Sequence, residues 1–310
     1  MKTHNINLES EIDLKSIALA IGNFDGIHLG HKSVIERLTH LSVSNNYQPS
    51  ILSFDPHPRI YFSKENKNFQ ITTNDEKINL LNKLGIVNYF CLQFDTDIAS
   101  LSPLEFIKKI LIDKLRIKYL IVGYDFKFGK DRKGDVNLLE EQSNFYGFKI
   151  DVIKQKYSKL NSEIYSSSSI RKFINDGNIE NANLFLGRNW SMTGVVIEGD
   201  KRAREINFPT ANINPPSIIH PKKGVYAVKT NYNNISFNGI ANFGERPTVD
   251  GKKLLLEVHL FNFDKNIYGK ELTVEFLAFI REEKKFGNFD LLTKQIQKDI
   301  KIVKTYYSKI

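Results

Sequence analysis

The stretch that decides the fold of the first half is residues 17–31, which read IALAIGNFDGIHLGH. Five apolar residues, Ile17–Ile21, lead into a glycine-rich turn, and a helical pattern follows from about His31 to Leu41. A short apolar run bounded by such a turn is typical of a strand buried in a parallel sheet. The start of the following helix offers free N–H groups, which suit a phosphate. The stretch therefore predicts a strand–turn–helix unit with an anion site at the turn.

The same alternation of strand-like and helical patterns continues to residue 153. We expect further strands and helices at Ser50–Phe54, Glu76–Leu84, Tyr89–Phe94, Pro103–Lys114, Tyr119–Val122, Asn137–Tyr146 and Lys149–Ile153. Strands that alternate with helices predict an α/β doubly wound, parallel sheet. Ligands of such sheets bind at the carboxyl ends of the strands, so the residues that follow each strand are candidate site residues.

The second half is rich in β-strand patterns. We expect strands at Met192–Glu198, Gly224–Thr230, Ser236–Asn242, Lys253–Phe261 and Glu271–Phe279, with one helix from Phe289 to about Tyr307. Closely spaced strands with one terminal helix favour a small antiparallel β-barrel. The change of pattern falls within residues 181–191, and we expect domains at 1–186 and 187–310.

Composition limits the class of protein. The 310 residues are 41% hydrophobic and 25% charged, which excludes a wholly disordered or fibrous chain. Cys91 is the single cysteine, so neither an intrachain disulfide nor a thiolate zinc cluster can form. No apolar run approaches the ~20 residues of a membrane helix, and the first residues lack a secretory signal. We expect a cytoplasmic protein with no membrane partner.

The net charge of +9 favours anionic partners without choosing among them. Most of the excess falls after Leu186, where basic residues are interleaved with acidic ones. A nucleic-acid-binding arm is more often a block of like charge, so we expect no nucleic-acid partner. Nucleic-acid binding is kept as an alternative function, and the oligomeric state is left open.

The turn after the first strand brings His28 and His31 to one place, where two imidazoles can donate hydrogen bonds to a triphosphate. A tight turn with two surface histidines, or a metal pair lacking a third ligand, are the other interpretations. The full string resembles the HxGH signature of the nucleotidyltransferase superfamily, whose members release pyrophosphate from ATP or CTP. The resemblance implies an ATP-binding turn formed by Gly22, Asn23, Phe24, Asp25 and Gly26.

A serine string, residues 165–171, resembles the second element of that superfamily. Serine hydroxyls can cap a helix and bind phosphate oxygens, while Arg171 can neutralise charge on the leaving pyrophosphate. A low-complexity serine loop is the other interpretation. The residues expected to bind ATP here are Ser166, Ser167 and Ser168, with Arg171 in a catalytic role.

Two further strings follow strands, at residues 54–58 and 123–130. Together with the histidine motif they resemble the FMN adenylyltransferase module of the bacterial bifunctional riboflavin kinase/FAD synthetase family. In that family these loops help to form the flavin site. The resemblance implies flavin contacts from Pro56, Pro58, Asp125 and Phe126.

In the second half the string Phe208–Asn212 offers a hydroxyl at Thr210 and an amide oxygen at Asn212, hard ligands suited to Mg²⁺. No Gly-x-x-x-x-Gly-Lys-Ser/Thr loop exists in the sequence, so a kinase here would hold ATP differently. The residues expected to bind ATP are Gly199, Lys201, Arg204 and Asn212. A plain turn at a strand end is the other interpretation of this string.

The strings at residues 242–248, 256–260, 268–270 and 281–286 follow in order, and this order resembles the riboflavin kinase domain of the same family. The resemblance implies that Glu257 is the general base for the ribityl 5′-hydroxyl, with Glu245 as a second choice. It also implies a flavin-covering loop that includes Arg281 and Phe286. Departures from the family pattern are Ala203 and Asn207, where glycines are usual, and Tyr165 before the serines.

The resemblance spans roughly residues 17–300. It implies a bifunctional enzyme that uses Mg²⁺ and ATP to convert riboflavin into FMN, and a second ATP to convert FMN into FAD and pyrophosphate. The alternatives are a nucleic-acid-binding protein and an adenylyltransferase for a phosphorylated substrate other than a flavin.

Overall fold

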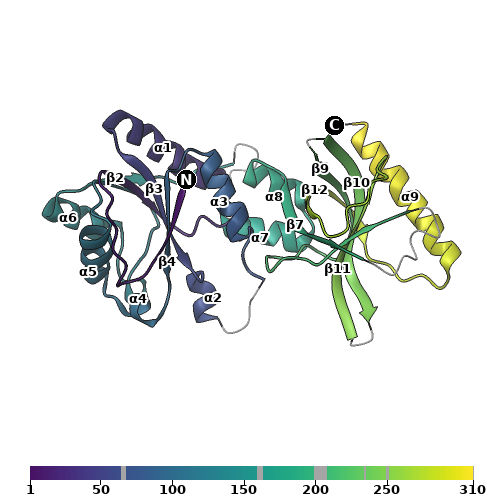
Figure 1. Cartoon of the computed structure of the whole chain (residues 1–310), viewed down its shortest axis with the longest axis horizontal. Helices are drawn as coiled ribbons and strands as arrows, with labels where there is room; N and C mark the ends of the chain where they lie inside the picture. Colours follow the sequence, from purple (N-terminus) through teal and green to yellow (C-terminus); the bar gives the residue numbers. More distant parts are fainter. Residues whose placement is uncertain (64–67, 159–162, 199–207, 234, 249–250, 310) are drawn as a thin grey trace. The chain divides into compact units, whose positions relative to one another are not determined.

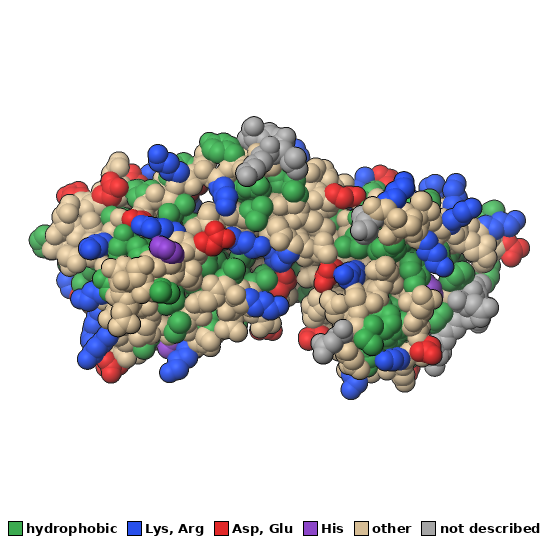
Figure 2. All heavy atoms as spheres, turned by 90° about the horizontal axis from the view of Figure 1, so that it is seen from above, with side chains coloured by type: hydrophobic (Ala, Val, Ile, Leu, Met, Phe, Trp, Pro, Cys, Tyr) green, Lys and Arg blue, Asp and Glu red, His purple; other side chains and the backbone are tan. Residues whose placement is uncertain are grey.

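The computed structural model describes residues 1–310 except 64–67, 159–162, 199–207, 234, 249–250 and 310. The chain divides into two compact units, Met1–Ser166 and Ser167–Ile310 (Figure 1). Basic and acidic side chains are interspersed on the face shown in Figure 2, where neither sign dominates a large area.

The first unit is built on a sheet of six strands whose neighbours are all parallel, in the order β1-β4-β3-β2-β5-β6. The strands are β1 Lys2–Ile6, β2 Ile17–Ile21, β3 Gln48–Asp55, β4 Asn88–Gln93, β5 Tyr119–Gly123 and β6 Lys149–Ile153. The chain moves from β2 toward β3 and β4, then returns to the other side of β2 for β5. The strand order therefore reverses between β2 and β5, which is where open α/β sheets bind ligands.

Strand β2 is buried on both faces, which is why its sequence is a continuous apolar run rather than an alternating one. Its odd-numbered side chains, Ile17, Leu19 and Ile21, pack into one apolar cluster. Ala18 and Ala20 face the opposite cluster, with Ile35 and Leu38 of a covering helix among its members. The small alanines let that helix, α1 (Leu29–Asn45), lie close to the sheet.

The helices of this unit are α1 Leu29–Asn45, α2 Pro58–Phe62, α3 Asn74–Lys83, α4 Thr96–Ser100, α5 Pro103–Phe106 and α6 Val136–Tyr146. The expected helix at Pro103–Lys114 exists, but its second part, Ile107–Lys114, is a π-helix. Strand β1 was not predicted, because its pattern is mostly polar and exposed. Helices α2 and α4 were not predicted either, because each is only five residues long.

The second unit contains a closed six-stranded barrel in the order β10-β11-β8-β7-β12-β9, in which paired strands are antiparallel. The elements are α7 Ser167–Asp176, α8 Ile179–Leu186, β7 Trp190–Ile197, β8 Ala211–Ile213, β9 Gly224–Tyr232, β10 Ile235–Thr248, β11 Gly251–Leu260, β12 Glu271–Glu282 and α9 Phe289–Tyr307. The expected parallel sheet, antiparallel barrel and terminal helix are thus all confirmed. Strand β8 was missed because three residues are too few to show a pattern.

Helix α9 is held against the barrel at its middle and at its C-terminal end. Near its middle, Asp299 is 2% exposed and accepts hydrogen bonds from Arg281 at the end of β12, with an Nη2–Oδ2 distance of 2.6 Å. Near its end, the Tyr307 hydroxyl donates to the Val228 carbonyl at 2.5 Å. Val303, fully buried, packs into an apolar cluster between these two anchors.

Candidate active sites

Three of the predicted motifs meet at the carboxyl ends of adjacent strands. The histidine motif follows β2, residues 56–58 follow β3, and residues 124–126 follow β5. Strands β3 and β5 are the two hydrogen-bonded neighbours of β2. The sheet order therefore brings the expected ATP loop and the two expected flavin loops to one edge of the first unit.

The ATP loop, residues 22–28, is folded in a strained conformation. Phe24 and Ile27 have φ angles of 48° and 40°, and Gly26 has a φ of 83°. Positive φ costs little for glycine but is unfavourable for an apolar or β-branched residue. A Cβ on Gly26 would also lie 3.1 Å from the side chain of Ile71. Strain of this kind persists where the surrounding structure imposes it, commonly at functional sites.

The Asp25 carboxylate holds this loop in place from inside the protein. It is 1% exposed and accepts hydrogen bonds from the backbone N–H of Ile71 at 2.8 Å and of Thr72 at 3.4 Å. In addition, the backbone N–H of Gly26 donates to the Thr72 hydroxyl. Asp25 was expected to bind ATP, and the structure gives it these internal partners. Nothing in the sequence pattern of residues 71–72 indicated this role.

The two histidines lie one above the other. Their ring centroids are 3.7 Å apart with an interplanar angle of 21°. His28 caps helix α1, and its Nδ1 accepts a hydrogen bond from the backbone N–H of His31 at 3.3 Å. A neutral His28 ring consequently carries its proton on Nε2, which makes that nitrogen a donor. A side chain at Gly30 would press on the His28 ring, because its Cβ would lie 3.0 Å from that ring.

The end of the expected serine string lies beside this loop. The Tyr165 carbonyl oxygen is 3.2 Å from the position that a Cβ on Gly30 would occupy. Ser166 is the last residue of the first unit, whereas Ser167 and Ser168 begin helix α7 in the second unit, one turn before Arg171. The histidines and Arg171 thus belong to different units.

Aromatic side chains cluster beside the loop that follows β3. Pro58 opens helix α2, whose Tyr61 and Phe62 rings both contact Phe94 in edge-on geometry, at 5.2 and 5.8 Å. Phe62 is 69% exposed. Pro56 and Pro58 were the residues predicted here. The aromatic residues were not predicted, because single aromatics scattered along a sequence have no characteristic spacing. An exposed aromatic surface of this kind suits a planar ring.

The loop after β5 is a tight turn closed by a hydrogen bond from the Phe126 N–H to the Gly123 carbonyl at 3.0 Å. Asp125 is exposed at its tip. The Phe126 ring stacks on Phe128, with centroids 5.6 Å apart and an angle of 14°. Asp125 is therefore accessible to a ligand, whereas the Phe126 ring is held in place by its packing on Phe128.

In the barrel, Glu257 of β11 lies between two asparagines. Its register partners are Asn212 on β8 and Asn242 on β10, so the three residues form a row across adjacent strands. Asn242 Nδ2 donates to Glu257 Oε2 at 3.5 Å. Asn212 is 6% exposed, and its side chain forms no hydrogen bond with another described residue. The amide oxygen of Asn212 is therefore available to a ligand beside the expected base.

The Glu257 carboxylate is also paired with Arg246 of β10, through Nη2. The Nη1 atom of Arg246 donates to Glu283 Oε1 at 3.1 Å. Burial by itself would lower the pKa of Arg246, but hydrogen bonds to Glu257 and the charges of both glutamates raise it. Glu245, the second choice of base, lies on the opposite face of β10 and pairs with Lys223 at 2.5 Å. The arrangement favours Glu257.

A cavity of about 500 Å³ lies beside the Pro209–Ala211 segment. Its other walls come from β7, from the end of β11 and from residues 263–268. His259 Nδ1 contacts the Pro209 carbonyl at 2.9 Å and so ties this segment to β11. The residues at 263–268 were missed, apart from Tyr268, because that loop has no distinctive motif. The cavity is large enough for a nucleotide base and ribose.

The residues beside this cavity fit Mg²⁺. Thr210 and Asn212 offer neutral oxygens, and Glu257 offers a carboxylate across the strand pair. Among the described residues no group of three His, Cys, Asp or Glu side chains could hold a metal by itself. Mg²⁺ usually takes one or two protein oxygens and completes its shell with water and phosphate, so such a cage is not required.

Arg281 lies near the end of β12, and Phe286 lies in the segment that follows this strand. The Arg281 guanidinium is held by Asp299 and lies over the Phe286 ring, 6.0 Å from its centroid. The structure thus gives Arg281 a structural partner, and a flavin contact from it stays a prediction. The predicted ATP ligands Gly199, Lys201 and Arg204, with Ala203 and Asn207, lie outside the described residues.

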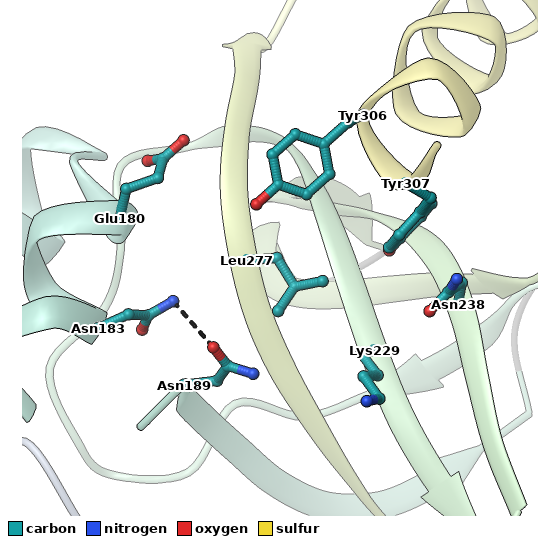
Figure 3. Close-up of a pocket in the computed structure, with 8 residues that line it drawn as sticks. All are labelled: Glu180, Asn183, Asn189, Lys229, Asn238, Leu277, Tyr306 and Tyr307. Atoms are coloured by element: carbon teal, nitrogen blue, oxygen red, sulfur yellow. Dashed lines mark hydrogen bonds between the residues drawn. The ribbon is translucent and has the colours of Figure 1, made fainter. Parts of the chain in front are cut away.

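A second cavity of about 500 Å³ lies between α8, α9 and the barrel (Figure 3). Its polar side chains form hydrogen bonds that hold α8 and α9 against the barrel. Asn183 Nδ2 donates to the Phe276 carbonyl at 2.8 Å, while its Oδ1 accepts from the Trp190 N–H at 2.7 Å. Asn189 donates to Glu275, and Tyr307 is held by β9. This cavity carries none of the predicted motifs.

Fold and sites together define an enzyme class: a nucleotidyltransferase-like unit joined to a small barrel that carries a glutamate beside hydroxyl and amide oxygens. The comparisons agree with this class. The family model for FAD synthetase matches residues 10–169, and the model for riboflavin kinase matches residues 186–307. The chain belongs to the bifunctional riboflavin kinase/FMN adenylyltransferase family.

Curated relatives match along nearly the whole chain. The bifunctional riboflavin kinase/FMN adenylyltransferase of Haemophilus influenzae is 39% identical over 296 residues, covering 95% of this chain and 96% of the relative. The enzyme of the same name from Bacillus subtilis is 36% identical, covering 99% and 98%.

A solved structure from Streptococcus pneumoniae, described as a macrolide-efflux protein, has a TM-score of 0.87 and 27% identity, covering 97% of this chain and 98% of that one. Within the described part of this chain, no helix is long and apolar enough to cross a membrane.

Proposed function

We propose that this chain phosphorylates riboflavin with ATP to give FMN and ADP, and then adenylylates FMN with a second ATP to give FAD and pyrophosphate. The observation that carries the proposal is that three of the first unit's motifs follow neighbouring strands of one sheet, while the barrel sets Asn212, Glu257 and Asn242 in one row. The three loops at the edge of the β3-β2-β5 strands serve adenylylation, and the Asn212–Glu257–Asn242 row serves phosphorylation. We assign these activities to residues 1–186 and 187–310.

In the kinase reaction, Glu257 accepts the proton of the ribityl 5′-hydroxyl as the new O–P bond forms and the bond to the ADP oxygen breaks. Asn242 and Arg246 hold the carboxylate in position. Thr210 and Asn212 would hold Mg²⁺, which supplies charge neutralisation at the ATP phosphates when it is bound. The carboxylate contributes by its position more than by its basicity.

In the adenylyltransferase reaction, the FMN phosphate is itself the nucleophile and is already anionic at neutral pH. No strong protein base is required. His28 and His31 donate hydrogen bonds to the triphosphate, while Ser166–Ser168 and Arg171 bind the pyrophosphate that leaves. Pro56, Pro58, Asp125 and Phe126 hold the flavin, with the aromatic cluster of α2 beside them. The protein acts by orientation and charge stabilisation.

The test is to incubate the purified chain with riboflavin, ATP and Mg²⁺ and to separate the flavins by chromatography. We expect FMN to appear first and FAD to follow, and no product without Mg²⁺. Absence of both FMN and FAD would refute the proposal. Replacing FMN with another phosphorylated acceptor in the same assay tests the alternative of a non-flavin substrate. Because both reactions draw on ATP, we place the enzyme in the cytoplasm.

A further inference from the structure

The arginine that binds the expected base also binds a second carboxylate, which the mechanism above does not use. The guanidinium of Arg246 contacts Glu257 through Nη2, and its Nη1 donates to Glu283 Oε1 at 3.1 Å. All three side chains are partly buried. A guanidinium carries its donors in a rigid plane, so carboxylates on two of its nitrogens fix its orientation. Glu283 therefore limits the directions from which Arg246 can hold Glu257.

Strand β10 has room for the Glu283 carboxylate because residue 244 is a glycine. The three atoms nearest to a Cβ built on Gly244 all belong to the carboxyl group of Glu283, and that Cβ would lie only 2.7 Å from Glu283 Cδ. The φ angle of Gly244 is not positive, so the backbone conformation does not require a glycine here. The close approach of Glu283 accounts for the glycine.

One face of β10 connects the base with the segment that follows β12. Asn242, Gly244 and Arg246 alternate along β10 and so share a face of that strand. Asn242 and Arg246 both contact Oε2 of Glu257, and no described residue donates a hydrogen bond to its Oε1. Glu283 directly follows the end of β12. The contacts thus hold one oxygen of the base and leave the other for a substrate.

We propose that Glu283 is a positioning residue for riboflavin phosphorylation, which fixes Arg246 and, through it, the Glu257 carboxylate. This proposal rests on the kinase activity proposed above. Without Glu283, the guanidinium of Arg246 is free to turn and bind both oxygens of Glu257, as arginine commonly does with a single carboxylate. With Glu283 in place, Oε1 of Glu257 stays available to the ribityl 5′-hydroxyl. Glu283 acts through Arg246 rather than on the reacting atoms.

The experiment combines two substitutions in the full chain, Glu283→Ala and Gly244→Ala, each alone and both together. Glu283→Ala removes the carboxylate from Arg246. Gly244→Ala places a methyl group where that carboxylate lies and so displaces it. In the double variant, the methyl group enters space that the carboxylate has left. For each variant, kcat and KM for FMN formation, FAD formation from supplied FMN and the thermal unfolding midpoint are measured.

Two glutamine variants separate the role of Glu283 from the general loss of a negative charge. Glu283→Gln keeps an oxygen that can accept a hydrogen bond from Arg246. Glu282→Gln is the matched control, because Glu282 is the neighbouring residue and pairs with Lys222 at 2.6 Å rather than with Arg246.

We expect Glu283→Ala and Gly244→Ala each to lower the kcat for FMN formation at least about tenfold, since a small misplacement of a catalytic group has an effect of this size. KM for riboflavin and for ATP changes less. The double variant loses no more than the weaker of the single variants, because both substitutions remove the same contact. Glu283→Gln keeps more activity than Glu283→Ala, and Glu282→Gln matches the wild type. FAD formation from supplied FMN is unchanged throughout.

The proposal is overturned by a single variant, Glu283→Ala or Gly244→Ala, that keeps the wild-type kcat for FMN formation. It is also overturned if Glu283→Ala raises KM for riboflavin at an unchanged kcat, which would make Glu283 a substrate contact. Losses that multiply in the double variant, or that only follow the unfolding midpoint, would show independent structural defects instead. A wild-type chain that forms no FMN refutes the proposed function, so the two failures are distinguishable.

Discussion

His31 is the residue whose substitution best separates the two reactions. It stacks on His28 at the start of α1, where it can donate to the triphosphate. We expect His31→Ala to reduce FAD formation by about 100-fold or more, the usual effect of losing one donor that stabilises developing charge. Chromatography of products from supplied FMN measures this loss, and FMN formation from riboflavin in the same sample is the control. Loss of both reactions in a folded variant would contradict the division of labour.

Glu257 provides the reciprocal test in the barrel. Glu257→Gln keeps the shape of the side chain and removes the proton acceptor, which for a general base typically lowers the rate by about 10²–10⁴-fold. We expect FMN formation to fall by this amount while FAD formation from supplied FMN continues. Glu245→Gln is the matched control, since Glu245 lies on the other face of β10 and pairs with Lys223. A larger effect from Glu245→Gln would make Glu245 the base.

Burial of Lys77 on helix α3 predicts how stability varies with pH. Burial lowers its pKa in the folded protein from the ordinary value of 10.5, so the unfolded chain binds more protons in the interval below 10.5. Stability therefore rises with pH across that interval for the wild type. Lys77→Met lacks this contribution. The free energy of unfolding of Lys77→Met should therefore exceed that of the wild type most at neutral pH, and the difference should shrink toward pH 10.5. Urea unfolding midpoints of both proteins at several pH values measure the difference. An advantage that widens with pH would contradict the argument.

Among the elements, helix α9 has the most specific anchor. The Asp299 carboxylate is 2% exposed and binds Arg281 of β12, and Gln295 donates to it at 2.7 Å. Removing one partner of a buried ion pair leaves an uncompensated charge, which costs about 3 kcal/mol or more. We expect Asp299→Ala to lower the free energy of unfolding of the second unit by that amount, measured by urea denaturation. FAD formation from supplied FMN should persist.

The control for this prediction is Lys301→Ala, an exposed position on the same helix. Its effect should stay within about 0.5 kcal/mol, as is usual for surface substitutions. Equal effects of the two substitutions would show that the helix is not held by the Arg281–Asp299 pair.

Elements with long, regular patterns were predictable from the sequence, and short or polar ones were not. Strand β2 and helix α9 were predicted with the bounds that the structure shows. Strand β8 has three residues and β1 is mostly polar, so neither shows an apolar period. Both exist because neighbouring strands offer hydrogen-bond partners, β4 to β1 and β11 with β7 to β8. Tertiary pairing, not local preference, produces these strands.

For the whole molecule, the net charge of +9 raised the alternative of nucleic-acid binding. Figure 2 shows basic side chains interspersed with acidic ones on the face in view. We expect no retention of duplex DNA or RNA in a filter-binding assay at about 150 mM salt, and only weak binding at low salt. Tight binding that falls steeply with salt would favour the alternative.

The sequence by itself determined the two fold classes, the family, and which loops are expected to carry the chemistry. It could do so because buried parallel strands require apolar runs, and because glycines, histidines and serines at a phosphate site occur in short strings along the chain. Only the tertiary structure decided how these loops are supported. The hydrogen bonds of Asp25 to residues 71 and 72, and the pairing of β8 with β11 that sets Asn212 beside Glu257, join residues far apart in the chain. Such contacts leave no local pattern, because their partners meet only when sheet and barrel have formed.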